Sequence, residues 1–171
     1  MKKTIIYLLL AMAVYLIMMV YTIPEIRSET GGIEIYDMRP GGYTVEEGYE
    51  ILDNITVRGL NIYRSIQLPL DFLYPMLFCL FLYNLWITLF NKGILYNIRW
   101  ITMSVMAFDY LENMGIYWIL EKQSALSIRI TSFMSLSKAI STSLVMTILM
   151  IGCIYKISKY LFKGSNKNAR A

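Results

Sequence analysis

Two acidic residues three positions apart lie in the middle of a long apolar run. Asp109 and Glu112 fall within residues 100–120, a stretch otherwise rich in Ile, Leu, Met, Tyr and Trp. A carboxylate at the centre of a bilayer costs roughly 2.5–3.5 kcal/mol on insertion scales, so such groups face a bundle interior or a wet cavity. Two carboxyl groups beside a base could also transfer protons to and from a substrate.

Two further charged residues lie where lipid-facing side chains would be expected. Lys138 interrupts another apolar run, and Asp71 lies near the start of a third. At about 1.5 Å per residue, Glu112 and Lys138 lie at equal depth, roughly 12 Å from the outer ends of their helices, and Asp71 lies at roughly 5 Å. An ion pair between Glu112 and Lys138 is therefore expected, with Asp109 and Asp71 in the same buried network. Asn113 follows Asp109 by four positions and shares its helix face.

The composition sets the class of protein. Hydrophobic residues make up 57% of the 171 residues and charged residues only 16%, whereas soluble domains have about 25% charged residues. A chain of this length holds a few spans and one modest polar segment. We therefore expect a single integral membrane domain over residues 1–171.

Four apolar stretches reach the length of about 20 residues that a membrane-spanning helix needs. The predicted fold class is all-α: a four-transmembrane-helix bundle with a partly helical extracytoplasmic loop between the first two spans. The predicted spans cover residues 4–23, 68–90, 100–120 and 130–155, the external loop covers residues 24–67, and the cytoplasmic tail covers residues 156–171.

The basic residues predict the orientation. They lie before the first span, between the second and third, and after the fourth, which is the positive-inside pattern of a multi-pass cell-membrane protein with both termini cytoplasmic. The loop of residues 24–67 carries eight acids and four bases, a net charge of −4, as suits an external segment. The members of these three basic groups are Lys2, Lys3, Lys92, Arg99, Lys156, Lys159, Lys163, Lys167 and Arg170.

A cleaved secretory signal is the alternative interpretation of the first span. Lys2 and Lys3 precede an apolar run, as in a signal peptide, but the run is long and ends without an Ala-x-Ala-like step. An uncleaved anchor is favoured. Cleavage would leave three spans and an external N-terminus.

The external loop contains local sequence patterns that predict secondary structure. The residues Thr44-Val-Glu-Glu47 fit a capping box, which predicts a helix from about Thr44 to Asn54. A second amphipathic stretch, residues 57–67, leads into the second span. Residues 33–37 alternate in the manner of a short extended strand.

Three motifs resemble a family of uncharacterised small four-helix membrane proteins from prokaryotes. They are Tyr-Asp-Met-Arg-Pro-Gly-Gly-Tyr at residues 36–43, Leu-Pro-Leu-Asp-x-x-Tyr-Pro at residues 68–75, and Phe-Asp-Tyr-Leu-Glu-Asn at residues 108–113. The resemblance covers about residues 33–120 and supplies no activity. It implies that the three motifs act together at one outer vestibule, to which the first motif adds Asp37 and Arg39.

The expected function is that of a structural or interaction subunit with a buried polar cluster in the outer half of the bundle. The alternatives are binding of a lipid-like or amphipathic ligand, an intramembrane enzyme, and ion or proton movement. The catalytic candidates are Asp109, Glu112 and Lys138 as acid–base groups, although a hydrolase without histidine or an activated serine lacks an identified nucleophile. The candidate ligand-binding residues are Asp37, Arg39, Asp71, Asp109, Glu112, Asn113 and Lys138.

No cofactor and no metal are expected. The chain has no histidine, and Cys79 and Cys153 both lie in apolar runs without metal-ligand spacing. The basic tail favours contact with anionic lipid headgroups over nucleic acid, because its bases adjoin a hydrophobic span. A membrane-protein partner or a second copy of the chain is a further candidate contact.

Overall fold

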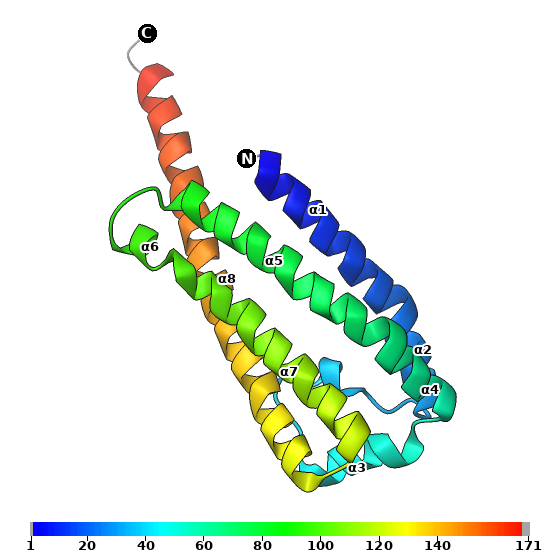
Figure 1. Ribbon diagram of the computed structural model, residues 1–171. Helices are drawn as coiled ribbons and strands as arrows, with labels where there is room; N and C mark the ends of the chain where they lie inside the picture. The colour runs from blue at the N-terminus through cyan, green and yellow to red at the C-terminus, as the bar shows by residue number, and fades with distance from the viewer. Residues whose placement is uncertain (1, 169–171) are drawn as a thin grey trace.

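The computed structural model describes residues 2–168, with side chains through residue 160, and this part of the chain contains helices but no strand. Four long helical segments run alongside one another (Figure 1). The first two each contain a five-residue π-helical turn between two α-helices. The segments are α1 (Lys2–Ile17) with α2 (Ile23–Glu29), α4 (Val57–Ile62) with α5 (Leu68–Leu89), α7 (Thr102–Lys122), and α8 (Ala125–Asn168).

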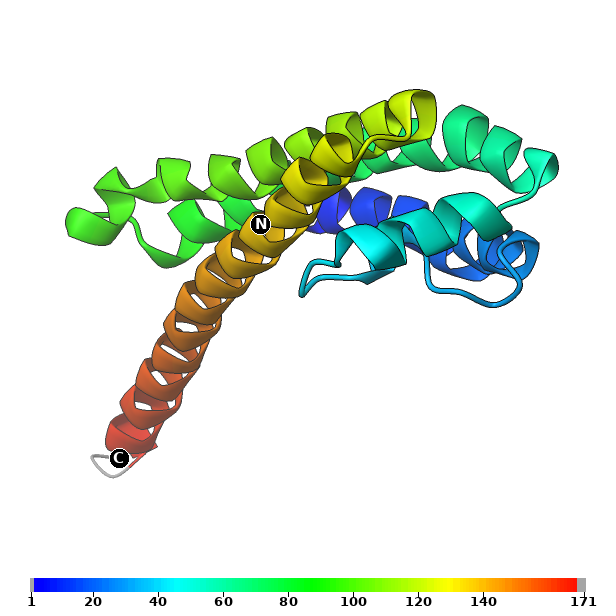
Figure 2. The ribbon, with the colours of Figure 1, turned by 90° about the horizontal axis from the view of Figure 1, so that it is seen from below.

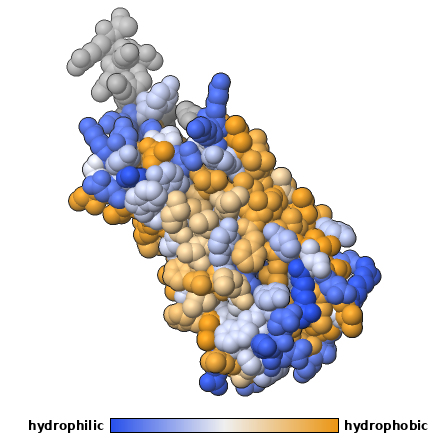
Figure 3. All heavy atoms as spheres, in the orientation of Figure 1, coloured by the Kyte–Doolittle hydropathy of each residue, from blue (hydrophilic) through white to orange (hydrophobic). Residues whose placement is uncertain are grey.

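Three of these segments are long and apolar enough to cross a membrane, which indicates a membrane protein. They cover Lys2–Glu29, Val57–Leu89 and Ala125–Tyr160. The surface shows the same pattern, because hydrophobic residues dominate the middle of the face in Figure 3 and hydrophilic residues gather at its two ends. The remaining long segment, α7, carries Asp109 and Glu112 near its centre and is not among these three.

The helices pack in the order α1, α5, α7, α8, each mainly against the next. The start of α1 and the end of α8 lie at one end of the molecule, here called the terminal end (Figure 1). The short helix α6 (Ile94–Asn97) connects α5 to α7 there. At the opposite end, here called the loop end, α7 turns into α8 at Gln123, which adopts the left-handed conformation with φ of 47°.

The α7–α8 contact is close because a glycine lies at the crossing. A Cβ atom added to Gly115 would lie 2.3 Å from the Thr131 hydroxyl oxygen, so no side chain fits there without movement. Small residues let transmembrane helices approach in this way. Farther toward the terminal end, α5, α7 and α8 share an apolar core of Leu82, Trp86, Val105, Val145 and Leu149.

Residues 30–56, here called the outer segment, fold against the loop end. They include the 3₁₀ turn Tyr36–Met38 and α3 (Val45–Asn54). The Tyr43 amide donates to the Ser132 hydroxyl of α8, and that hydroxyl donates to the Tyr43 carbonyl, both at 2.7 Å. In Figure 2 the outer segment lies on the same side of α5 and α7 as the second half of α8. It is therefore a docked element of the bundle.

The prediction of a helix from Thr44 to Asn54 is confirmed. The Thr44 hydroxyl accepts from the Glu47 amide at 3.2 Å, and the Glu47 carboxylate accepts from the Thr44 amide at 2.7 Å. The hydrogen bond from the Thr44 backbone, together with the charge of Arg39, holds the pKa of Glu47 below its usual range. The capping box therefore works best with Glu47 ionised.

The predicted strand at residues 33–37 is wrong. Residues 36–38 form a 3₁₀ turn, and the Met38 amide donates to the Ile35 carbonyl at 3.1 Å. Ile35 and Tyr36 are adjacent and both fully buried, which a strand with one solvent-facing side would not allow. The Tyr36 hydroxyl donates to the Gly48 carbonyl at 2.7 Å and thereby ties the turn to α3.

The helix bounds differ from the predicted spans at several ends. The first helical segment continues beyond residue 23 to Glu29, and the second begins at Val57 rather than at residue 68. The helix of the fourth span starts earlier, at Ala125, and continues through the predicted tail to Asn168. The side chains of Lys163, Lys167 and Arg170 lie outside the described part of the chain.

Candidate functional site

Lys138 of α8 bridges both acids of α7. Its Nζ atom lies 2.7 Å from Glu112 Oε2 and 3.0 Å from Asp109 Oδ1. The predicted contact between Glu112 and Lys138 is confirmed. The two acids are almost completely buried, whereas the Lys138 side chain keeps 24% of its surface exposed. The cluster therefore has one edge open to its surroundings, at the lysine.

Asp71 joins the cluster through Asn113. The Asn113 side-chain amide donates to the Asp71 carbonyl at 2.7 Å and to Asp109 Oδ1 at 3.4 Å. Asp71 is 3% exposed and Asn113 is fully buried. The second and third sequence motifs thus meet between α5 and α7.

The outer segment brings Asp37 to the same place. The Asp37 carboxylate accepts a hydrogen bond from the Tyr63 hydroxyl and neighbours the side chain of Asp71. Four acids from three parts of the chain consequently lie in one cluster, and two of them, Asp109 and Glu112, contact Lys138 directly. All three motifs contribute to one cluster, here called the polar cluster: Asp37, Asp71, Asp109, Glu112, Asn113 and Lys138.

Arg39, a predicted ligand-binding residue, makes its contacts within the outer segment and not with the polar cluster. Its guanidinium group lies 3.1 Å from the Glu47 carboxylate and donates to the Glu34 carbonyl at 3.0 Å. Successive residues of a 3₁₀ turn are rotated by about 120°, so positions 37 and 39 leave the turn in different directions. Arg39 therefore supports the fold of the outer segment.

A pocket of about 280 Å³ opens beside the polar cluster. One wall comes from the outer segment, with Asp37 and Pro40, and the other from the α7–α8 pair. The α8 wall is rich in hydroxyl groups, because Ser135, Thr142 and Ser143 line it along with Ala139. Glu112 and Lys138 form its charged floor.

Several buried oxygen atoms at the polar cluster have no hydrogen-bond partner among the described residues. They are Asp37 Oδ1, Asp71 Oδ2 and Asn113 Oδ1, together with the hydroxyl of the adjoining Tyr43. Burial, and then the charge of Glu112, raise the pKa of Tyr43, so this hydroxyl stays protonated. Nearly all buried polar groups in proteins are paired. The two carboxyl oxygens and the amide oxygen of Asn113 therefore each have room for a hydrogen-bond donor.

Sequence reasoning missed Tyr63, Thr142 and Ser143. The spacing of Ser135, Lys138 and Thr142 follows the three- and four-residue steps of one helix face, and this periodicity was a usable signal for Thr142. Tyr63 offered no such signal, because its contact with Asp37 depends on how the outer segment folds back.

The arrangement limits the chemistry. No group of three or more acidic or cysteine side chains in the described residues has the geometry to hold a metal ion. The polar cluster offers hydrogen-bond acceptors in excess and a single cation, which suits the binding of a donor group.

Over its described residues the protein is all-helical, has three helices long and apolar enough to cross a membrane, and carries a charged pocket between the outer segment and the α7–α8 pair. Comparison of the chain with protein-family models, curated proteins and solved structures gave no match. The resemblance to small four-helix membrane proteins stays a prediction, and a function is therefore inferred from the geometry of the site.

Proposed function

We propose that the chain is a four-span protein of the cell membrane with both termini in the cytoplasm. Beside the three segments that are long and apolar enough, the remaining span is α7, the third along the chain. Its 21 residues give a length of about 31 Å, which matches a hydrocarbon core of about 30 Å. Its two acids are supported inside the bundle by Lys138, so they do not face lipid.

Cysteine labelling tests this topology. We expect a cysteine at Asn54, in the outer segment, to react with a membrane-impermeant maleimide added to intact cells. A cysteine at Tyr160, near the end of α8, should react only after the membrane is permeabilised. Both variants need Cys79 and Cys153 replaced by serine. Labelling of the Tyr160 position alone in intact cells would overturn the proposed orientation.

We propose further that the polar cluster binds the head of an amphipathic ligand that enters from the bilayer. The observation that carries this proposal is the pocket itself: Asp37 lines a space of about 280 Å³ together with the Glu112–Lys138 ion pair, so the charged groups are reached from an open pocket. A cluster that served only to fix helix packing would satisfy its buried groups internally. Instead, Asp37 Oδ1, Asp71 Oδ2 and Asn113 Oδ1 accept no hydrogen bond from the described residues.

The missing partner is a hydrogen-bond donor with positive charge. The polar cluster holds four carboxyl groups and a single lysine, which pairs with two of them, and the unpartnered atoms of Asp37, Asp71 and Asn113 are acceptors. A primary ammonium group supplies three donors and a compensating charge. The apolar surface of the neighbouring helices would receive the hydrocarbon part of such a molecule.

Thermal unfolding with three matched amphiphiles tests the proposal. We expect dodecylammonium to raise the unfolding midpoint of the protein in a nonionic detergent, whereas dodecanol and dodecanoate, which share its chain, should not. The shift follows from binding to the folded state only. Asp37→Asn should abolish the shift, and Asp53→Asn, an exposed acid of the same outer segment, should keep it.

Equal shifts with all three amphiphiles, or a full shift in Asp37→Asn, would overturn the ligand site. A proton shared between Asp37 and Asp71 satisfies the same two oxygens without a ligand. In that case dodecylammonium would give no shift, and the polar cluster would be left with a structural role.

A further inference from the structure

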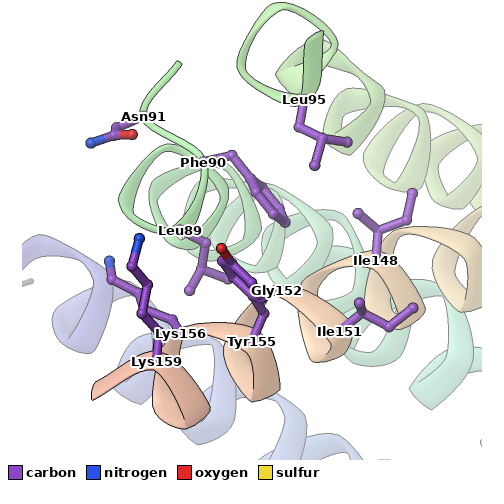
Figure 4. A pocket seen from close by; sticks show the side chains of 10 residues that line it. All are labelled: Leu89, Phe90, Asn91, Leu95, Ile148, Ile151, Gly152, Tyr155, Lys156 and Lys159. Carbon is purple, nitrogen blue, oxygen red and sulfur yellow. The ribbon is translucent and has the colours of Figure 1, made fainter. Parts of the chain in front are cut away.

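The largest hollow among those described lies far from the polar cluster, at the terminal end. It has a volume of about 650 Å³ and lies between the end of α5, the α5–α6 connection and the second half of α8 (Figure 4). The polar cluster contributes no residue to its lining. The charges of the hollow also differ, because the lining residues that the structure describes include two lysines and no acid.

The lining of this hollow changes from apolar to basic along α8. Ile148 and Ile151 come first, Tyr155 follows one turn later, and Lys156 and Lys159 lie closest to the terminal end. At 1.5 Å per residue, the step from Ile148 to Lys159 covers about 16 Å. Figure 4 shows the two lysine side chains together on one side of the hollow, with Ile148 and Ile151 on the other.

The opposite wall changes from apolar to polar. Phe90 and Leu95 provide apolar surface, and Asn91 lies on the same side of the hollow as the two lysines (Figure 4). A Cβ atom on Gly152 would lie 2.5 Å from the Phe90 ring, so the absence of a side chain there allows the ring to close the floor of the hollow. Apolar walls with a cationic rim toward the terminal end match a lipid with an anionic head.

We propose that this hollow binds an acidic glycerophospholipid. The acyl chain lies along Ile148 and Ile151, the ester region is level with Tyr155, and the phosphate lies between Lys156 and Lys159. Lys156 donates one hydrogen bond to the Thr88 carbonyl at 2.7 Å, which leaves two of its three N–H groups for the phosphate. The site is independent of the polar cluster.

Lipid retention on the full-length protein, purified in mild detergent, tests the proposal. The probes are phosphatidylglycerol and phosphatidylcholine with identical acyl chains, and native mass spectrometry counts the bound lipid. We expect phosphatidylglycerol to be retained preferentially. Because a basic residue near an anionic headgroup changes affinity about fivefold, Lys156→Gln with Lys159→Gln should weaken retention by roughly tenfold or more.

Two matched controls separate a built site from diffuse charge attraction. Lys2→Gln with Lys3→Gln removes the same charge at the same end of the molecule and should leave retention unchanged. Ile151→Trp fills the apolar wall without changing charge and should reduce retention. Ile154→Trp changes a residue of equal exposure, 62%, that does not line the hollow, and should have no effect.

Equal retention of the two lipids by the unchanged protein would overturn the proposal. So would equal losses in the two double-lysine variants, because general attraction of basic residues to anionic lipid would then account for the binding. If the Ile151→Trp variant retained as much phosphatidylglycerol as the unchanged protein, the acyl chain would not lie along Ile151.

Discussion

Replacing Lys138 by methionine should destabilise the protein more than replacing either of its acidic partners. Lys138 lies within 3.0 Å of both Asp109 and Glu112, so its loss leaves two buried carboxyl groups without a cation. Removing one partner of a buried ion pair costs about 3–5 kcal/mol. Glu112→Gln or Asp109→Asn alone leaves the other ion pair intact, and each should cost about 1–3 kcal/mol.

The triple variant Asp109→Asn, Glu112→Gln and Lys138→Met should recover part of this loss. It removes all three charges together, so no uncompensated charge remains, and coupled residues show such non-additivity. Denaturant titration in mixed micelles measures the free energy of unfolding of each variant. Lys122→Met, the same change at an exposed lysine of α7, is the control and should stay within about 0.5 kcal/mol.

Additive losses would contradict the bridged arrangement. If the triple variant lost as much stability as the three single variants combined, Lys138 would not be coupled to the two acids. A Lys138→Met variant as stable as the control would show that the side chain turns away from the bundle.

Gly115→Ala should also destabilise the protein strongly, although alanine is the better helix former. In an exposed helix this change gains about 1 kcal/mol. Here the added methyl group would lie 2.3 Å from Thr131 Oγ1 and 2.8 Å from Thr131 Cγ2. Because the Thr131 hydroxyl is held by a hydrogen bond to the Ser127 carbonyl at 2.7 Å, α7 and α8 must separate, at a cost of about 1–3 kcal/mol.

A second substitution tests the cause. Thr131→Ala removes both of the nearest atoms and should restore part of the stability of Gly115→Ala. The matched control is Gly41→Ala, because a Cβ atom there meets nothing within 4 Å. An unchanged free energy of unfolding in Gly115→Ala would mean that the two helices are not in close contact at this crossing.

The sequence by itself determined the helical class and the main ion pair. Apolar runs of about 20 residues can satisfy their backbone groups in a bilayer only as helices or closed barrels, and the four runs are too long for barrel strands. Glu112 and Lys138 were predictable as partners because depth along a helix follows from residue number alone. The capping box at Thr44 and Glu47 was equally local, since four consecutive residues define it.

Only the tertiary structure decided which residues complete the polar cluster. Asp37 reaches it and Arg39 does not, because a 3₁₀ turn rather than a strand forms at residues 36–38. That turn depends on the burial of Ile35 and Tyr36 against distant parts of the chain, which no local pattern encodes. The double contact of Lys138 likewise depends on the close approach of α7 and α8 at Gly115, and this packing is a property of two helix surfaces together.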